Sequence, residues 1–139
     1  MAVLFRFEVH TPNRLFYSDQ VEAIVLTLID GEAAVYANHV PFSAPVIPCL
    51  LKIKEKDGIW KTAFADEGIL EVTNKKTVLI SDSAEWPQEI DCERAMGAKK
   101  KAEETLQGKS HNYITGTATA ALKRANMRIR ASKEVPEKI

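Results

Sequence analysis

The sequence predicts an α+β protein in which a β-sandwich or flattened barrel, residues 1–86, precedes an antiparallel hairpin of two helices, residues 87–139. Three observations lead to this prediction. Short stretches rich in β-branched residues recur before residue 85, with turn residues between them. No segment of helical periodicity longer than two turns interrupts these stretches. Two longer helical patterns follow Trp86-Pro87, where the proline ends the last strand.

The expected strands begin with FRFEVH, in which Phe5, Phe7 and Val9 share one face because side chains alternate along a strand. Thr11-Pro12-Asn13 ends this strand, since proline has no N–H to give to the sheet. The spacing of the candidates, roughly 8–12 residues with turn residues between them, is typical of a sandwich or barrel. The other candidates are residues 21–28, 46–54, 60–65, 69–73 and 77–81.

The second part of the sequence predicts helices over about residues 91–107 and 112–132. Asp91 suits the N-cap of the first helix because its carboxylate can accept from free amides of the first turn. Gly108, with Lys109 and Ser110, supplies the stop and the turn. Apolar stripes at steps of three and four residues let the two helices pack as antiparallel neighbours. The stripes are Cys92, Ala95, Met96, Ala102 and Leu106, and then Ile114, Ala118, Leu122, Ala125 and Ile129.

These stripes predict a hairpin that is held together weakly. Alanine buries little area, so at about 25 cal/mol per Å² the contact between the helices contributes only a few kcal/mol. Gly97, in the middle of the first helix, costs about 1 kcal/mol relative to alanine. Helices held this loosely can separate and pack against another surface.

The charge of the chain is unevenly distributed, although its formal net value is zero. Residues 1–88 hold 8 Lys and Arg against 12 Asp and Glu, whereas residues 89–139 hold 11 against 7. An acidic body with a basic tail indicates a tail that meets an anionic partner. A solvated charged helix face explains the same asymmetry, and the charge alone favours that plainer interpretation.

No catalytic or metal-binding pattern stands out. His10, His39 and His111 lack metal-ligand spacing, and the chain has no glycine-rich phosphate loop, nucleophile elbow or HExxH segment. We therefore expect no catalysis, no bound metal ion, no tightly bound cofactor and no nucleic-acid partner. Cys49 and Cys92 lie far apart in the chain and are expected to be unpaired.

Membrane insertion and secretion are also not expected. No apolar run approaches the roughly 20 residues that span a bilayer. Arg6 and Glu8 interrupt the apolar stretch at the N-terminus, so we expect no signal peptide.

Several segments follow one another in a characteristic order: HTPNRLFYSDQVEAIVL, then DGE…NHVPFSAPV, then GILEV, then EIDCERA at the start of a helical hairpin. Together they resemble the epsilon subunit of the bacterial and chloroplast F-type ATP synthase, whose mitochondrial equivalent is called delta. The resemblance covers essentially the whole chain. It implies a ten-stranded flattened sandwich followed by two C-terminal helices.

The chain departs from this family in two loops. The family usually carries glycines where this chain has GEAAVYANH, and a Gly-Gly pair where it has Ala65-Asp66-Glu67-Gly68. Other residues fit such positions only where φ is negative or the strain is tolerated. The departures therefore concern the geometry of these loops.

The resemblance implies a non-catalytic rotor subunit that couples rotation to ATP synthesis, driven by protons or sodium ions. Such a subunit binds gamma, rests on the ring of c subunits, and lies at the cytoplasmic face of the bacterial plasma membrane or the stromal face of the thylakoid. Glu32 and His39 lie, by resemblance, in the loop that approaches the c ring and gamma.

In many members of the family the helices extend and restrain ATP hydrolysis. About 42 helical residues at 1.5 Å each would reach roughly 60 Å, far enough to meet the alpha and beta subunits of the catalytic head. The cations that would meet acidic helical segments of beta there are Lys99, Lys100, Lys101, Arg124, Arg128 and Arg130.

Some members bind ATP between the folded helices without cleaving it, and their [IL]DxxRA segment has a counterpart here. The residues implied by this resemblance are Glu85, Ile90, Asp91, Arg94, Ala95, Lys101, Arg124 and Arg128. Arginine forks would neutralise the triphosphate, and Asp91 would accept from the adenine amino group. Lys101 stands where these members carry arginine, which should weaken phosphate binding.

Two alternatives remain open for this set. Asp91 suits an N-cap whether or not ATP binds, and the arginines could instead bind the beta subunits. The chain could also be a stand-alone nucleotide-sensing protein.

Overall fold

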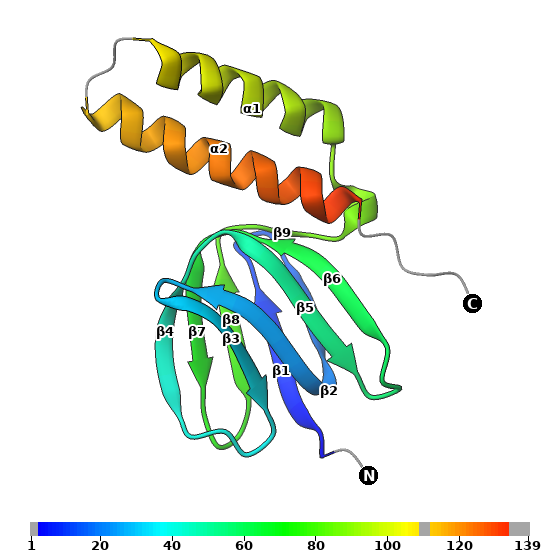
Figure 1. The fold of residues 1–139 in the computed structure, drawn as a ribbon. Helices are drawn as coiled ribbons and strands as arrows, with labels where there is room; N and C mark the ends of the chain where they lie inside the picture. Colours follow the sequence, from blue (N-terminus) through cyan, green and yellow to red (C-terminus); the bar gives the residue numbers. More distant parts are fainter. Residues whose placement is uncertain (1–2, 109–111, 134–139) are drawn as a thin grey trace.

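The computed structural model describes residues 3–108 and 112–133, with the backbone alone for residues 112–115. Within these residues, a β-sandwich carries a hairpin of two antiparallel helices across one of its ends (Figure 1). The predicted fold class and the order of its two parts are confirmed.

One sheet of nine strands forms the sandwich in the described part of the chain, in the order β1-β8-β7-β4-β2-β5-β6-β9, with β3 paired to β2. A further pairing of β1 with β2 closes the sheet on itself. The β1–β8 pair is parallel, and the other pairs are antiparallel. The strands are β1 Phe5–His10, β2 Leu15–Leu28, β3 Gly31–Tyr36, β4 Phe42–Val46, β5 Cys49–Glu55, β6 Trp60–Ala65, β7 Gly68–Val72, β8 Thr77–Ser81 and β9 Ala84–Glu85.

The core of the sandwich is formed by the inward-facing side chains of alternate strand positions, as the FRFEVH pattern predicts. Phe7 and Val9 of β1 are fully buried. They join buried aliphatic side chains from the other strands, among them Ile24, Leu26, Leu51, Ile53, Leu70 and Leu79. This core contains no residue of the helices.

The strand count corrects the expectation of ten strands, because the structure has nine in its described residues. The long strand β2 explains part of the difference. Its first half pairs with β1, and its second half pairs with β3 and β5. An irregularity in its register against β5, between Val21 and Ala23, marks the place where one strand changes neighbours.

The sequence interpretation missed β3 and β4, which it assigned to one loop. In β3 only Val35 is buried, so GEAAVY lacks the alternation that indicates a strand. Pro45 lies inside β4, and a proline within a stretch of sequence argues against a strand there. The expected strand 46–54 is in fact divided at Ile47 and Pro48 into the last residue of β4 and most of β5, which runs to Glu55.

The loops that depart from the family have ordinary backbone geometry. Among the described non-glycine residues, only Asn38 has a positive φ, 65°, and asparagine tolerates this conformation well. The alanines of GEAAVYANH and the Asp66-Glu67 pair therefore need no glycine.

The two helices are α1, Cys92–Gln107, and α2, Asn112–Ser132. Asp91 caps α1, since its carboxylate accepts from the Arg94 amide at 3.0 Å. Gly108 ends α1 and donates its N–H to the Glu104 carbonyl, although its φ of −80° is not left-handed. Lys109 and Ser110, expected to complete the turn, lie outside the described residues.

The small residues of the predicted stripes do form the seam between the helices. Those buried are Ala95, Ala102, Ala118 and Ala125. Met96 was placed in the stripe wrongly, since it is 52% exposed. The side chain of Ile114 lies outside the described part of the structure. Cys49 and Cys92 are unpaired, as predicted.

Candidate functional site

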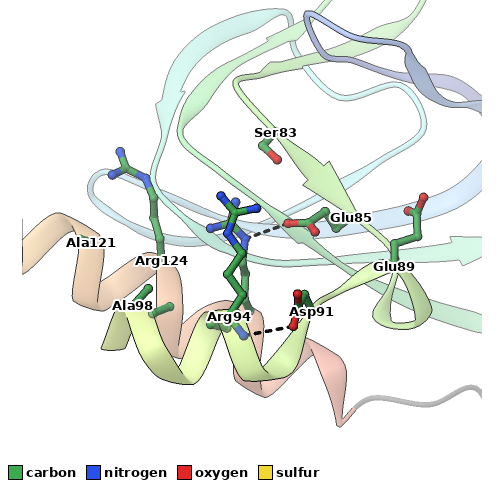
Figure 2. A pocket seen from close by; sticks show the side chains of 11 residues that line it. Ser83, Glu85, Glu89, Asp91, Arg94, Ala98, Ala121 and Arg124 are labelled. Carbon is green, nitrogen blue, oxygen red and sulfur yellow. Dashed lines mark hydrogen bonds and ion pairs between the residues drawn. The ribbon is translucent and has the colours of Figure 1, made fainter. Parts of the chain in front are cut away.

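A pocket of ≈ 510 Å³ opens between the two helices, the linker before α1 and the nearest strands of the sandwich (Figure 2). It brings together residues up to about 45 positions apart in the sequence. Six of the eight residues expected at a nucleotide site line it: Glu85, Asp91, Arg94, Ala95, Arg124 and Arg128.

Arg124 of α2 is bound to the sandwich. Its Nε donates to Oδ1 of Asp66 at 2.8 Å, and its Nη2 donates to Oε1 of Glu67 at 3.2 Å. Asp66 is only 7% exposed, so this pair is largely shielded from water. The hydrogen bond to Asp66 raises the pKa of Arg124 despite its partial burial. Figure 2 shows the Arg124 guanidinium turned away from Asp91.

Arg128, one turn further along α2, is engaged in a similar way. Its Nε donates to Oε1 of Glu85 at 2.7 Å, and its guanidinium lies 4.5 Å from the centre of the Phe64 ring. Glu85 was expected to contact a nucleotide. In this structure its carboxylate accepts from Arg128.

Arg94 is exposed, and its guanidinium has no ion-pair partner among the described residues. Figure 2 shows its side chain extending from α1 towards Glu85. With Arg94 included, the charges of the pocket lining balance: three carboxylates, of Glu85, Glu89 and Asp91, accompany three guanidinium groups. An anion that enters must therefore compete with carboxylates for two of its three arginines.

Ile90 and Lys101 do not line this pocket. Ile90 is half-buried in the linker, where its N–H donates to the Pro87 carbonyl at 3.4 Å. Lys101 lines a neighbouring cavity of ≈ 340 Å³ in the seam between the helices. Both cavities share Ala98 and Ala121, so Lys101 lies beside the candidate site rather than in it.

Sequence reasoning missed the partners that hold the arginines. Asp66 and Glu67 precede β7, and 58 residues separate Asp66 from Arg124. No spacing rule joins positions so distant. The available signal was the charge asymmetry of the sequence, in which residues 1–88 are acidic and residues 89–139 are basic. The lining residues that were not expected are Ser83, Glu89, Ala98, Ala121 and Ala125.

Glu32 and His39, the candidate subunit-interface residues, do not share a loop, which corrects the expectation that both lie in one. Glu32 belongs to β3 and pairs with Thr27, whereas His39 follows the other end of that strand. Both are exposed. The His39 ring contacts the Val40 carbonyl at 2.7 Å and packs against Phe42 at 5.0 Å.

In residues 3–108 and 112–133, no three His, Cys, Asp or Glu side chains gather as a metal site. No helix in these ranges has the length and apolar character needed to cross a membrane.

An apolar row crosses the outer surface of the sandwich. Leu15 pairs with His10, which pairs with Ile80. Ile80 pairs with Ile69, and Ile69 pairs with Pro45. Leu15, Ile69 and Ile80 are each more than half exposed, at 55%, 53% and 55%. We call Leu15, Ile80, Ile69 and Pro45 the apolar row.

Comparison with known proteins gives concordant results along the whole chain. The family model for the β-sandwich domain of the ATP synthase delta/epsilon chain matches residues 4–87, and the model for its long α-helix domain matches residues 88–133. The ATP synthase epsilon chain of Caldicellulosiruptor bescii is 44% identical over 97% of this chain and 98% of that relative. The epsilon chain of Caldanaerobacter subterraneus is 42% identical over 99% of both.

Solved structures of low sequence identity share the fold. A chain of the Euglena gracilis mitochondrial ATP synthase has a TM-score of 0.82 at 18% identity, over 96% of this chain and 84% of its own length. A chain of the Tetrahymena thermophila central stalk and c-ring structure has a TM-score of 0.67 at 11% identity, over 94% and 98%. The family models and the two epsilon-chain relatives together show that the chain belongs to the delta/epsilon chain family of ATP synthase.

Proposed function

We propose that the chain is the epsilon subunit in the central stalk of an F-type ATP synthase, with the sandwich as its attachment to the rotor and the hairpin as a regulator of ATP hydrolysis. The main support for this proposal is that family models match both parts of the chain, the sandwich and the hairpin. Members of this family are non-catalytic chains of the enzyme complex. The complex lies at the cytoplasmic face of the bacterial membrane in this proposal.

The apolar row supports gamma as the partner of the sandwich. Contiguous apolar side chains on the surface of a soluble domain mark protein contacts, and permanent subunit interfaces are the more apolar ones. Ile80, Ile69 and Pro45 are contiguous in the row, whereas the exposed His10 lies between Ile80 and Leu15. The three contiguous apolar side chains suit a permanent neighbour. The end of the sandwich around His39 is left for the c ring.

Replacing Ile69 with aspartate should weaken binding of the chain to gamma by tenfold or more, which corresponds to about 1.4 kcal/mol. The fold should persist, because this side chain is exposed. Ile59→Asp is the matched control, since Ile59 is 45% exposed and lies outside the row. Titration of purified gamma with each variant measures the effect. Equal affinities of the two variants for gamma would contradict the assignment of the row.

The arrangement of the hairpin supports its role as a movable arm. The sandwich core contains none of its residues, and the seam between its helices consists largely of alanine. Released from the sandwich, the two helices could extend and bring their cations to the alpha and beta subunits.

Deleting residues 91–139 should leave assembly with gamma intact and raise ATP hydrolysis by the reconstituted complex several-fold. The deletion removes the arm and keeps the sandwich, the apolar row and the linker. The measurement compares ATP hydrolysis with the full-length and shortened chains over a range of ATP concentrations. Unchanged hydrolysis throughout would remove the inhibitory role, whereas failed assembly would show that the hairpin takes part in attachment.

We also propose that ATP binds in the ≈ 510 Å³ pocket as a regulatory ligand. The three arginines support this, because guanidinium forks match phosphate oxygens. The same pocket supports the alternative of a stand-alone nucleotide-sensing protein. Such a protein would not co-purify with gamma from membranes, whereas a stalk subunit would.

A further inference from the structure

A second pocket, of ≈ 550 Å³, lies at the end of the sandwich opposite the hairpin. Its lining comes mainly from the start of β1, the loop between β3 and β4, and the turn between β7 and β8. Figure 1 shows all three segments at the end of the sandwich away from the helices. We call this cavity the foot pocket.

The lining of the foot pocket is cationic. Among the described residues that line it, none is Asp or Glu, whereas carboxylates equal arginines in number in the pocket between the helices and the sandwich. Residues 1–88 are acidic overall, with 8 Lys and Arg against 12 Asp and Glu. Three of these eight cations line the foot pocket, so the pocket attracts an anion. The cations are Arg6, Lys75 and Lys76, and side-chain amides of Gln20, Asn38 and Asn74 accompany them.

The two lysines stand on a turn that is already formed. The N–H and the hydroxyl of Thr73 both donate to the Lys76 carbonyl, at 3.0 and 2.9 Å. The amides of Lys75 and Lys76 donate to the Thr73 hydroxyl, at 3.3 and 3.2 Å. These bonds use only the backbone of the lysines. A ligand of their ammonium groups therefore meets a preorganised turn, which lowers the entropy cost of binding.

The acidic neighbour of these cations neutralises them only in part. Glu8 lies outside the lining, with one carboxylate oxygen 3.4 Å from Nε of Arg6 and the other 3.4 Å from Nζ of Lys76. Arg6 also donates from Nη2 to the Ser18 hydroxyl, which fixes its guanidinium. In residues 3–108 and 112–133, Lys75 has no ion-pair partner. One carboxylate thus serves two of the three cations, and a net positive charge remains.

Exposed apolar side chains surround the foot pocket. Val3, Tyr36 and Val40 are each more than half exposed. Tyr36 lines both the foot pocket and an adjoining cavity of ≈ 270 Å³, which Val3 also lines. Val40 directly follows His39 of the pocket lining. A small free anion would leave these side chains in water, whereas a membrane surface would cover them. Tyrosine beside cations is typical of residues at the membrane–water interface.

We propose that the foot pocket binds the phosphate group of an anionic phospholipid, with Arg6, Lys75 and Lys76 around the phosphate and Val3, Tyr36 and Val40 in the interfacial layer. Guanidinium and ammonium groups suit this ligand because both form charge-assisted hydrogen bonds to phosphate oxygens. The site lies at the end of the sandwich that the proposed function assigns to the c ring, and hence beside the membrane. The inference concerns the isolated chain, so its failure would leave the proposed stalk role and regulation standing.

Flotation of the full chain with lipid vesicles tests the site. Vesicles of phosphatidylcholine alone are compared with vesicles in which one third of the lipid is phosphatidylglycerol, and with vesicles given the same charge by oleate. The foot variant, Lys75→Gln with Lys76→Gln, removes two exposed cations and keeps the backbone bonds of their turn. The matched control, Arg130→Gln with Lys133→Gln, removes the same charge from exposed positions at the other end of the molecule.

The unaltered chain should bind the phosphatidylglycerol vesicles more tightly than either of the other two kinds. The foot variant should lose roughly tenfold or more in partition coefficient, since each cation beside an anionic surface contributes about fivefold. The control should lose much less. Val40→Ser should weaken vesicle binding several-fold, because it removes an apolar contact from the rim. Thermal melting by circular dichroism checks that each variant is folded.

Four results would overturn the inference. Equal binding to phosphatidylcholine and phosphatidylglycerol vesicles would exclude an anionic headgroup as the ligand. Equal losses in the foot variant and the control would assign the binding to the charge of the whole chain. Oleate vesicles bound as tightly as phosphatidylglycerol would show that phosphate is not recognised. Isothermal titration that saturates with inorganic phosphate, together with no vesicle binding, would make the ligand a free anion.

Discussion

Replacing Gly68 with alanine is expected to destabilise the sandwich by about 3 kcal/mol, the upper part of the range for overpacked sites. A Cβ atom at this position would lie 1.9 Å from the Ile80 carbonyl oxygen and 2.9 Å from the Cα of Ser81. These are backbone atoms of the neighbouring strand, so no side chain can turn aside. Relief requires β7 and β8 to separate where Gly68 pairs with Ser81.

Urea unfolding followed by tryptophan fluorescence measures this effect, because Trp86 is packed on the sandwich. Gly97→Ala is the matched control with the opposite sign. Nothing lies within 4 Å of a Cβ added at Gly97, and alanine there should strengthen α1 by about 1 kcal/mol. Helical circular dichroism follows this second change. A Gly68→Ala chain with an unchanged urea midpoint would contradict the close approach of the two strands.

Gly68 shows what sequence patterns can and cannot predict about this fold. Alternation identifies β1, and the turn residues between strands indicate a sandwich. The contact that requires a glycine at position 68 arises between strands that only the folded register brings together. Strand β3 could not be predicted from the sequence for a related reason. Its pairing with β2, and not its composition, makes it a strand.

The candidate site could likewise be predicted only in part from the sequence. Local rules place Asp91 at the start of α1 and put Arg124 and Arg128 on one face of α2, since residues four apart are neighbours on a helix. Whether those arginines face solvent, a ligand or the sandwich depends on residues far away in the sequence. In the structure both arginines bind carboxylates of the sandwich: Arg124 binds Asp66, and Arg128 binds Glu85.

These ion pairs limit how tightly the pocket could hold a nucleotide. A buried or half-buried carboxylate that loses its arginine must be solvated again, and that free energy reduces the affinity of the competing phosphate. Among the described residues that line the pocket, Arg94 is the one arginine available without such an exchange. We therefore expect weaker ATP binding than three free guanidinium groups would give.

Replacing Arg128 with alanine is expected to weaken ATP binding by roughly tenfold to a hundredfold, if the proposed pocket is the site. One charge-assisted contact is worth about 1.5–3 kcal/mol, part of which the present bond to Glu85 already offsets. Isothermal titration of the full chain with ATP up to millimolar concentrations measures the change. Arg130→Ala is the matched control: it removes the same charge from the same helix, at an exposed position outside the pocket.

Lys101→Arg adds a test of how far the site extends. Lys101 lies beside the pocket, in the cavity that shares Ala98 and Ala121 with it. A guanidinium fork there should strengthen binding if the triphosphate reaches the seam between the helices. Equal heats for the Arg128→Ala and Arg130→Ala chains would place ATP elsewhere. No heat for the unaltered chain would mean that these arginines serve the sandwich and the protein partners alone.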